Sequence, residues 1–272
     1  MANESVVEVQ VDGAKIACRR IGNGRPLVVI NGFAATSADW DPAFTFRLAS
    51  SNDLILVDNR GIGRSTDDGR PVDIARLADD VLQVIEAFDN ERVNVLGWSM
   101  GGFVAQTLAV QHPSRVRKLI LLSTDFGGTD ADLTTPAIWS QLVDMSGTPR
   151  DQARRLLSLL FPGDVAESIY REFGDTIAAA RSRLSPSLVN RQIAAMEAWH
   201  RAGISARVRE LNVPVLVATG LADIVIPPSN ALKLVNAIPG AWLAQFNGGG
   251  HAFMAQFPHP LADLIDSFLE VE

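Results

Sequence analysis

Hydrophobic and polar positions alternate near the start of the chain, and short apolar runs recur after that. Ser5–Val11 and Ala14–Ile21 alternate on either side of Asp12-Gly13, a dipeptide that is typical of a two-residue hairpin turn. The later runs predict strands at 27–30, 54–57, 93–96, 119–122, 215–218 and 242–246. These runs are apolar throughout, which is typical of parallel strands that are covered on both faces.

Stretches with a helical period separate these predicted strands. They lie near residues 38–49, 74–88, 100–111, 230–237 and 261–269. Strands that alternate with helices indicate an α/β fold. We therefore expect a mostly parallel, eight-stranded sheet that is flanked by helices and begins with one antiparallel hairpin.

Residues 125–206 show a different periodicity, with several helix starts and no strand pattern. Thr148-Pro149 and Ser185-Pro186 each place a capping residue before a proline, which is typical of the first turn of a helix. The second start precedes an apolar stripe formed by Val189, Ile193, Met196 and Trp199. We expect residues 1–124 and 207–272 to form one sheet domain and residues 125–206 to form an all-helical lid inserted into it.

The charge balance narrows the choice of partners. The chain of 272 residues has a formal net charge of −7 and a pI near 5.1. Nucleic acids and anionic membranes bind basic surfaces, so we expect neither as a partner. A small neutral or apolar substrate fits this charge better. The sequence leaves the assembly state open, and a homo-oligomer is compatible with it.

Targeting signals and cysteine content favour a cytoplasmic protein. No basic start followed by an apolar run opens the chain, so we expect no signal peptide. No stretch approaches the run of apolar residues that a membrane span needs. Cys18 is the only cysteine, which excludes an intramolecular disulfide and a metal site built on cysteines. Its place in a predicted strand favours packing over reactivity.

One serine lies at a sharp turn between a predicted strand and a predicted helix. Gly97-Trp98-Ser99-Met100-Gly101 follows the apolar run 93–96 and opens the helical pattern 100–111. A GxSxG turn lifts the serine hydroxyl clear of the sheet, and its glycines let the strand and the helix approach closely. Ser99 is therefore the candidate nucleophile.

A serine hydroxyl needs a neighbouring base that accepts its proton, and the chain has four histidines. His251 follows the strand 242–246 and the segment Asn247-Gly248-Gly249-Gly250, a loop that can carry an imidazole over the edge of the sheet. The others lie at a helix end, on the lid and between two prolines, namely at His112, His200 and His259. We therefore predict that His251 is the base.

The base needs a carboxylate that orients it and stabilises the imidazolium. Asp223 follows a predicted strand near the same edge of the sheet as Ser99, and open α/β sheets bind ligands at that edge. The chain order Ser99, Asp223, His251 is that of hydrolases with a nucleophile elbow. Asp125, which also follows a predicted strand, is the rival acid, and we favour Asp223.

Acyl transfer also needs two donors aimed at the developing oxyanion. One is the backbone N–H of Met100, the residue after the nucleophile. The second is expected from the loop after the strand 27–30, where Gly32 lets the backbone turn inward. The N–H of Phe33 is our candidate in that loop.

Over nearly its whole length the chain resembles the α/β-hydrolase superfamily. The resemblance includes the loop at Gly32, the segment 58–65, the Ser99 elbow and the loops of Asp223 and His251. In style the sequence is similar to small bacterial esterases, cofactor-free haloperoxidases, enol-lactone hydrolases and carbon–carbon bond hydrolases. This resemblance implies that residues 58–65 form a structural turn and that the reaction needs no cofactor and no metal. The glycine spacing in this segment fits neither a P-loop nor a dinucleotide fingerprint, so we expect no phosphate site there.

One position departs from the family pattern. Asn31 precedes Gly32 where the family usually has a histidine, which leaves the hydrogen bonding of the oxyanion loop open. That histidine is normally supporting, so the expected triad is unaffected. Ser99 in place of an aspartate argues against haloalkane dehalogenase and epoxide hydrolase relatives, because their chemistry needs a carboxylate nucleophile.

These residues and the resemblance lead to one main expectation and two alternatives. We expect a serine hydrolase of small to medium, largely apolar carboxylic esters or lactones that acts through an acyl-enzyme. A carbon–carbon bond hydrolase of vinylogous diketones and a small-molecule receptor on the same fold remain open, because fold does not determine substrate. The candidate substrate-binding residues are Phe33, Trp98, Trp139 and Trp199.

Overall fold

All the strands that the sequence predicts are present in the computed structural model, which describes residues 4–88 and 92–271. They are β1 (Glu4–Val11), β2 (Ala14–Gly22), β3 (Arg25–Ile30), β4 (Asn52–Val57), β5 (Val93–Trp98), β6 (Val116–Leu122), β7 (Val215–Gly220) and β8 (Trp242–Phe246). They form one sheet in the order β1-β2-β4-β3-β5-β6-β7-β8. β1 and β4 each pair antiparallel with β2, and the remaining pairs of described strands are parallel. The predicted mostly parallel, eight-stranded sheet is confirmed.

The antiparallel start has the predicted turn. Val11 pairs with Ala14 across Asp12 and Gly13, and Gly13 has a φ of 72°, a backbone conformation that glycine adopts without strain.

The expectation of no signal peptide also involves residues 1–3, which lie outside the described residues. Among the described helices, none has both the length and the apolar character needed to cross a membrane.

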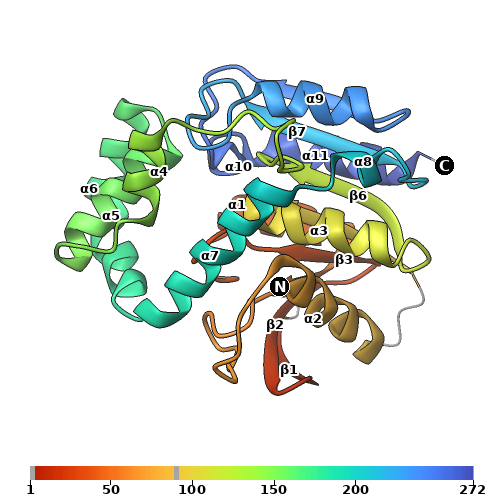
Figure 1. Ribbon diagram of the computed structural model, residues 1–272, viewed down its shortest axis with the longest axis horizontal. Coiled ribbons are helices and arrows are strands. Elements are labelled where there is room, and N and C mark those ends of the chain that lie inside the picture. The colour runs from red at the N-terminus through yellow and green to blue at the C-terminus, as the bar shows by residue number, and fades with distance from the viewer. Residues whose placement is uncertain (1–3, 89–91, 272) are drawn as a thin grey trace.

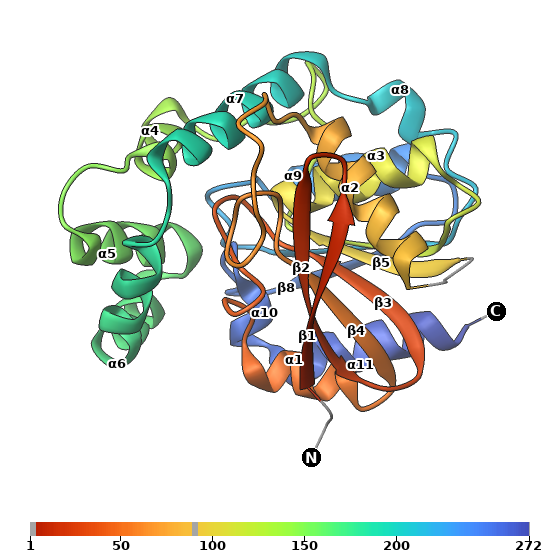
Figure 2. The same ribbon diagram turned by 90° about the horizontal axis from the view of Figure 1, so that it is seen from below.

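Helices cover both faces of the sheet (Figure 1, Figure 2). One face carries α1 (Pro42–Ala49), α10 (Phe253–Gln256) and α11 (Pro258–Glu270). The other carries α2 (Ile74–Ala87), α3 (Met100–Gln111) and α9 (Ser229–Ala237). The single turn of α10 is too short to produce a periodic pattern, which is why the sequence did not indicate it.

Two apolar cores lie on the two sides of the sheet. Along β3, Leu27 and Val29 point into the core under α1 and α11, whereas Val28 and Ile30 point into the core under α2 and α3. All four side chains are at most 2% exposed. The continuous apolar runs of the central strands are explained by this burial on both faces.

The chain between β6 and β7 forms helices only. They are α4 (Pro136–Val143), α5 (Pro149–Leu160), α6 (Gly163–Arg181), α7 (Pro186–Ala202) and α8 (Ser205–Val208). Figure 1 and Figure 2 show α4, α5 and α6 to one side of the sheet, and α7 leading back toward α3. The predicted capping residue Thr148 accepts a hydrogen bond from the N–H of Asp151, and the Asp151 carboxylate accepts one from Thr148 N–H in return.

The buried face of α7 differs from the predicted apolar stripe. Val189, Met196 and Trp199 are buried as expected, but Ile193 is half-buried and Gln192 is fully buried in its place. A polar side chain is tolerated at such a position only when it finds a hydrogen-bond partner. The partner of Gln192 lies in the loop after β3, and hydrophobic periodicity gives no sign of such a contact.

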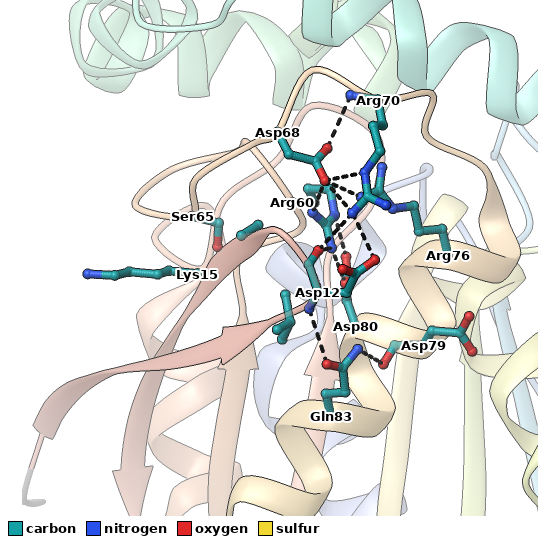
Figure 3. A network of polar contacts seen from close by, with 12 residues as sticks. Asp12, Lys15, Arg60, Ser65, Asp68, Arg70, Arg76, Asp79, Asp80 and Gln83 are labelled. Atoms are coloured by element: carbon teal, nitrogen blue, oxygen red, sulfur yellow. Dashed lines mark hydrogen bonds and ion pairs between the residues drawn. The ribbon is translucent and has the colours of Figure 1, made fainter.

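A polar network joins the first hairpin to α2 and to the loop between β4 and α2 (Figure 3). The Arg60 side chain is completely buried, and its Nε and Nη2 donate to the two carboxylate oxygens of Asp80 at 2.9 and 2.5 Å. Arg60 also donates to the backbone oxygen of Asp12 in the hairpin turn. Burial raises the pKa of Asp80, an effect that the Arg60 guanidinium opposes.

The segment 58–65 is a turn held by its own polar groups. Asp58 accepts hydrogen bonds from the N–H groups of Ser37 and Arg64, and Ser65 Oγ donates to the backbone oxygen of Asp58. The side chains of Asp58 and Ser65 are therefore used within the fold, as the resemblance implies.

Burial and the charge of Asp58 raise the pKa of the Cys18 thiol to about 12. This thiol therefore stays protonated near neutral pH, consistent with packing rather than reactivity.

Candidate active site

Ser99 lies at the turn between β5 and α3 with φ 55° and ψ −123°, a conformation that non-glycine residues rarely adopt. The glycines around it are required by close packing. A Cβ on Gly97 would lie 2.3 Å from the backbone oxygen of Gly101, and a Cβ on Gly101 would lie 2.2 Å from the backbone oxygen of Ile30. The strand, the helix and β3 therefore meet only because these positions lack side chains.

Ser99, His251 and Asp223 form one hydrogen-bonded chain. The Ser99 Oγ lies 2.9 Å from His251 Nε2, and His251 Nδ1 lies 2.8 Å from Asp223 Oδ2. The three residues are 8%, 2% and 5% exposed, so the contacts are shielded from water. They come from the loops after β5, β8 and β7, which end at the same edge of the sheet.

The other oxygen of Asp223 is bound by backbone. The N–H groups of Val225 and Ile226 both donate to Asp223 Oδ1 at 2.9 Å. These two donors leave Oδ2 directed at His251 and hold the carboxylate in one orientation. The backbone of His251 is also held, because Trp98 Nε1 donates to its carbonyl oxygen at 3.0 Å. The residue before the serine thus holds the histidine loop.

The rival acid, Asp125, makes different contacts. Its Oδ1 accepts hydrogen bonds from Gly127 N–H at 2.7 Å and from Trp199 Nε1 at 3.1 Å. The histidine nearest to it is His200, whose Nε2 lies 3.8 Å from Asp125 Oδ2. Between the two candidate carboxylates, only Asp223 is hydrogen-bonded to His251.

The two predicted oxyanion donors have no hydrogen-bond acceptor among the described residues. The N–H of Met100 is the first in α3 and has no acceptor within the helix. The N–H of Phe33 has no hydrogen-bond acceptor among residues 4–88 and 92–271. In the loop that carries Phe33, a Cβ on Gly32 would lie 3.3 Å from the Ser99 Cβ and 3.2 Å from the Trp98 ring, so this loop approaches the turn at Ser99 closely.

The structure shows how Asn31, which stands where the family usually has a histidine, is hydrogen-bonded. Asn31 is fully buried, its Nδ2 donates to the backbone oxygen of Val57 at 2.8 Å, and its Oδ1 accepts a hydrogen bond from Trp40 Nε1. Asn59 Nδ2 donates to the backbone oxygen of Asn31 at 3.2 Å. Asn31 therefore ties the oxyanion loop to the end of β4 and to Trp40.

Gln192 of α7 lies near this site, and the sequence did not indicate its role. Its Oε1 accepts a hydrogen bond from Ala34 N–H at 2.9 Å, across a separation of 158 residues. Ala34 has a positive φ of 52°, so this contact holds an unusual backbone conformation beside Phe33. The one signal in the sequence is a polar residue on the otherwise apolar buried face of this amphipathic helix.

A cavity of about 460 Å³ opens beside Ser99. Its apolar wall includes Phe103, Leu133, Pro136, Trp139, Leu142, Met196, Val225 and Ile226. Of the four candidate substrate-binding residues, only Trp139 is among the described residues that line this cavity. Trp199 lies behind the wall and stacks on Phe103 with ring centroids 4.9 Å apart, Trp98 packs against His251, and Phe33 is half-buried in the oxyanion loop.

Comparison with known proteins identifies the family of this chain. A family model described as the alpha/beta hydrolase fold matches residues 25–258. The chain belongs to the α/β-hydrolase superfamily. The match runs from β3 to the start of α11 and thus includes Ser99, Asp223 and His251.

Relatives of this α/β-hydrolase cover most of its length. A protein named carbamate hydrolase RutD from Azorhizobium caulinodans is 27% identical, covering 91% of this chain and 92% of the relative. Among solved structures, a hydrolase from Pseudomonas aeruginosa is 26% identical with a TM-score of 0.83 and 99% of each chain covered. The esterase RhEst1 from a Rhodococcus species is 27% identical with a TM-score of 0.81 and 98% of each chain covered. These likenesses support a hydrolase of the α/β-hydrolase fold.

Proposed function

We propose that this α/β-hydrolase is a serine hydrolase of small to medium, largely apolar carboxylic esters or lactones. The observation that carries the proposal is the hydrogen-bonded chain from Ser99 through His251 to Asp223 at the nucleophile elbow. A serine with a rare backbone conformation, a histidine at hydrogen-bond distance and a carboxylate behind it are the parts that acyl transfer requires.

The proposed reaction has two halves that use the same groups. His251 Nε2 takes the proton from Ser99 Oγ as this oxygen attacks the substrate carbonyl carbon, and Asp223 stabilises the imidazolium that forms. His251 then returns the proton to the departing alkoxide, which leaves an acyl group on Ser99. In the second half, His251 takes a proton from water as the water oxygen attacks the acyl carbon, and it returns this proton to Ser99 Oγ as the bond between this oxygen and the acyl carbon breaks and the acid is released.

The proposed oxyanion hole consists of the N–H groups of Met100 and Phe33, neither of which needs its hydrogen bond for the fold. The apolar cavity beside Ser99 would hold the substrate, and its volume falls within the range of small-molecule sites. We propose that residues 125–206 act as a cap over this cavity, because α4 and α7 supply Trp139, Leu142 and Met196 to its wall. The relative named an esterase also favours ester substrates.

The test is hydrolysis of p-nitrophenyl esters from acetate to dodecanoate, together with a set of aliphatic lactones. We expect turnover with an optimum at an intermediate acyl length, because the cavity is apolar and of limited volume. Labelling with a fluorophosphonate, followed by intact mass measurement and peptide mapping, should place one adduct on Ser99. An absence of turnover on every ester and lactone would contradict the proposal and favour carbon–carbon bond cleavage. A stable adduct with single turnover would favour the receptor alternative.

Gln192 is expected to act as a positioning residue in this reaction. Gln192→Leu removes the acceptor of Ala34 N–H, so the loop that carries the Phe33 N–H is no longer held against the elbow. We expect kcat for the best p-nitrophenyl ester to fall about tenfold or more with little change in KM, because small misplacements of a donor weaken transition-state binding. Steady-state kinetics measure both constants.

Ile193→Ala is the matched control for this variant, since Ile193 is half-buried on the same helix and the adjacent residue. Its loss disturbs the packing of α7 without removing the contact to Ala34. A fall in kcat as large as that of Gln192→Leu would show that the general packing of α7, and not this hydrogen bond, is responsible.

A further inference from the structure

The cavity beside Ser99 is also lined by polar side chains that the proposed mechanism does not use, namely Asp125, Asp132, Thr134, Glu197, His200 and Arg201, and only Asp125 among them is buried. Asp125 lines the cavity although it is only 2% exposed. Gly127 N–H and Trp199 Nε1 occupy its Oδ1 and hold the carboxylate in one orientation. Within residues 4–88 and 92–271, no donor makes a hydrogen bond to Oδ2. A carboxylate oxygen that lacks a donor, on a residue that lines a cavity, is a strong acceptor for a ligand.

His200 lines the same cavity and faces this oxygen. Its ring meets Phe103 and Trp139 at steep angles of 74° and 68°, with centroids 5.7 and 5.5 Å apart, so aromatic packing sets its orientation. The side chain is 18% exposed. The distance between His200 Nε2 and Asp125 Oδ2 is 3.8 Å, which is too long for a direct hydrogen bond.

Two polar atoms at this separation can share one oxygen atom. An oxygen about 2.8 Å from both His200 Nε2 and Asp125 Oδ2 makes two hydrogen bonds of normal length. It must donate to the carboxylate, which only accepts, and it can accept from the protonated Nε2 of the imidazole. A hydroxyl group has one donor and two acceptor sites and meets both requirements.

We propose that Asp125 and His200 form a hydroxyl-binding subsite, so that the preferred substrates carry a hydroxyl group on the apolar moiety that fills this cavity. The inference rests on the proposed function in taking the cavity's ligand to be a substrate. The subsite lies within the same cavity as Ser99 but is separate from the groups that react.

Other polar groups fit the pair less well. A ketone or ether oxygen cannot donate to the carboxylate, and a carboxylate ligand would be repelled by Asp125. An ammonium group can donate to Asp125 but has no lone pair with which to accept from His200 Nε2. A hydroxyl is therefore the group that this site selects.

The test compares p-nitrophenyl esters of ω-hydroxyalkanoic acids, from hydroxyhexanoate to hydroxydecanoate, each with the alkanoate that is one carbon longer. The members of a pair have nearly equal length and differ in a terminal hydroxyl or methyl group. For the pair whose length matches the subsite, we expect kcat/KM of the hydroxy ester to be about tenfold higher or more, the size expected for a hydrogen bond to a charged group.

His200→Phe keeps the ring packing and removes Nε2, and Asp125→Asn keeps the acceptor for Gly127 and Trp199 and removes the carboxylate. We expect the ratio of the two kcat/KM values to fall toward one in each variant. His112→Phe is the matched control, because His112 lies at the C-terminal end of α3 and does not line the cavity. It should leave the ratio at its wild-type value.

A second measurement does not depend on turnover. Calorimetric titration of the wild-type chain with an α,ω-alkanediol and with the alkanol of equal length should show the diol binding about tenfold more tightly, and His200→Phe should remove the difference. If no ester is hydrolysed but this preference is found, the proposed function fails and the hydroxyl subsite stands.

Three other outcomes would contradict the proposal of a hydroxyl-binding subsite. They are an equal response to both members of every pair in wild type, a hydroxyl preference that survives in His200→Phe, and tighter binding of an ω-aminoalkanol than of the diol. If esters are hydrolysed with any of these results, the proposed function stands and the hydroxyl subsite fails.

Discussion

Replacing Ser99 with alanine is expected to lower kcat for ester hydrolysis by about 10⁶. The substitution removes only Oγ, the atom that lies 2.9 Å from His251 Nε2, and keeps the Cβ that the tight turn already accommodates. Without Oγ the remaining groups can bind the substrate and polarise its carbonyl, but they cannot form the acyl-enzyme. Steady-state kinetics with the best p-nitrophenyl ester and a background-corrected rate measure the loss.

Two controls separate this loss from misfolding. The thermal unfolding midpoint of Ser99→Ala should remain close to that of wild type, because no buried methylene group and no structural hydrogen bond of the sheet is removed. The fluorophosphonate adduct should disappear in the variant. Retention of wild-type turnover in Ser99→Ala would eliminate this serine as the nucleophile.

Asp223→Asn is expected to lower kcat by about 10⁴ while leaving the fold intact. The N–H groups of Val225 and Ile226 both require an acceptor, so the amide oxygen of the asparagine should take the place of Oδ1. The amide NH₂ then faces His251 Nδ1 and must donate to it. The imidazole is forced to carry its proton on Nε2, so it presents a donor to Ser99 Oγ and cannot accept the serine proton.

The comparison variant is Asp125→Asn, because Asp125 also follows a strand at the carboxyl edge of the sheet. Asp125 makes no contact with His251, and its loss should change kcat on unsubstituted esters by far less than the loss of Asp223. If kcat of Asp125→Asn fell by about 10⁴ and Asp223→Asn kept the wild-type kcat, Asp125 and not Asp223 would be the acid of the proposed mechanism.

The sequence alone predicted the sheet and the helices that flank it. Alternation around Asp12-Gly13 and the apolar runs that followed placed all eight strands, because hydrophobic periodicity is a local property that burial imposes directly. Boundaries were less exact. The helix expected near 38–49 begins at Pro42, since the side chain of Asp41 accepts a hydrogen bond from Phe44 N–H and caps it there.

The candidate nucleophile was also readable locally. Gly97, Ser99 and Gly101 lie within five positions of one another, and the steric need for the glycines arises within the turn and its neighbouring strand. Its expected partners are 124 and 152 residues away, and only the order of strands in the sheet brings their loops to one edge. The sequence therefore predicts Asp223 and His251 as the partners of Ser99, but it does not give the distances between their atoms.

Tertiary structure alone decided what the helices between β6 and β7 contribute. Trp199 of α7 stacks on Phe103 and donates to Asp125, and the same helix places Gln192 at the loop after β3 and His200 near Asp125. These pairs join parts of the chain 158 and 75 residues apart, counting from Ala34 to Gln192 and from Asp125 to His200. No periodic pattern encodes such contacts, because they depend on how a helix lies against loops from other parts of the chain and not on the residues within the helix.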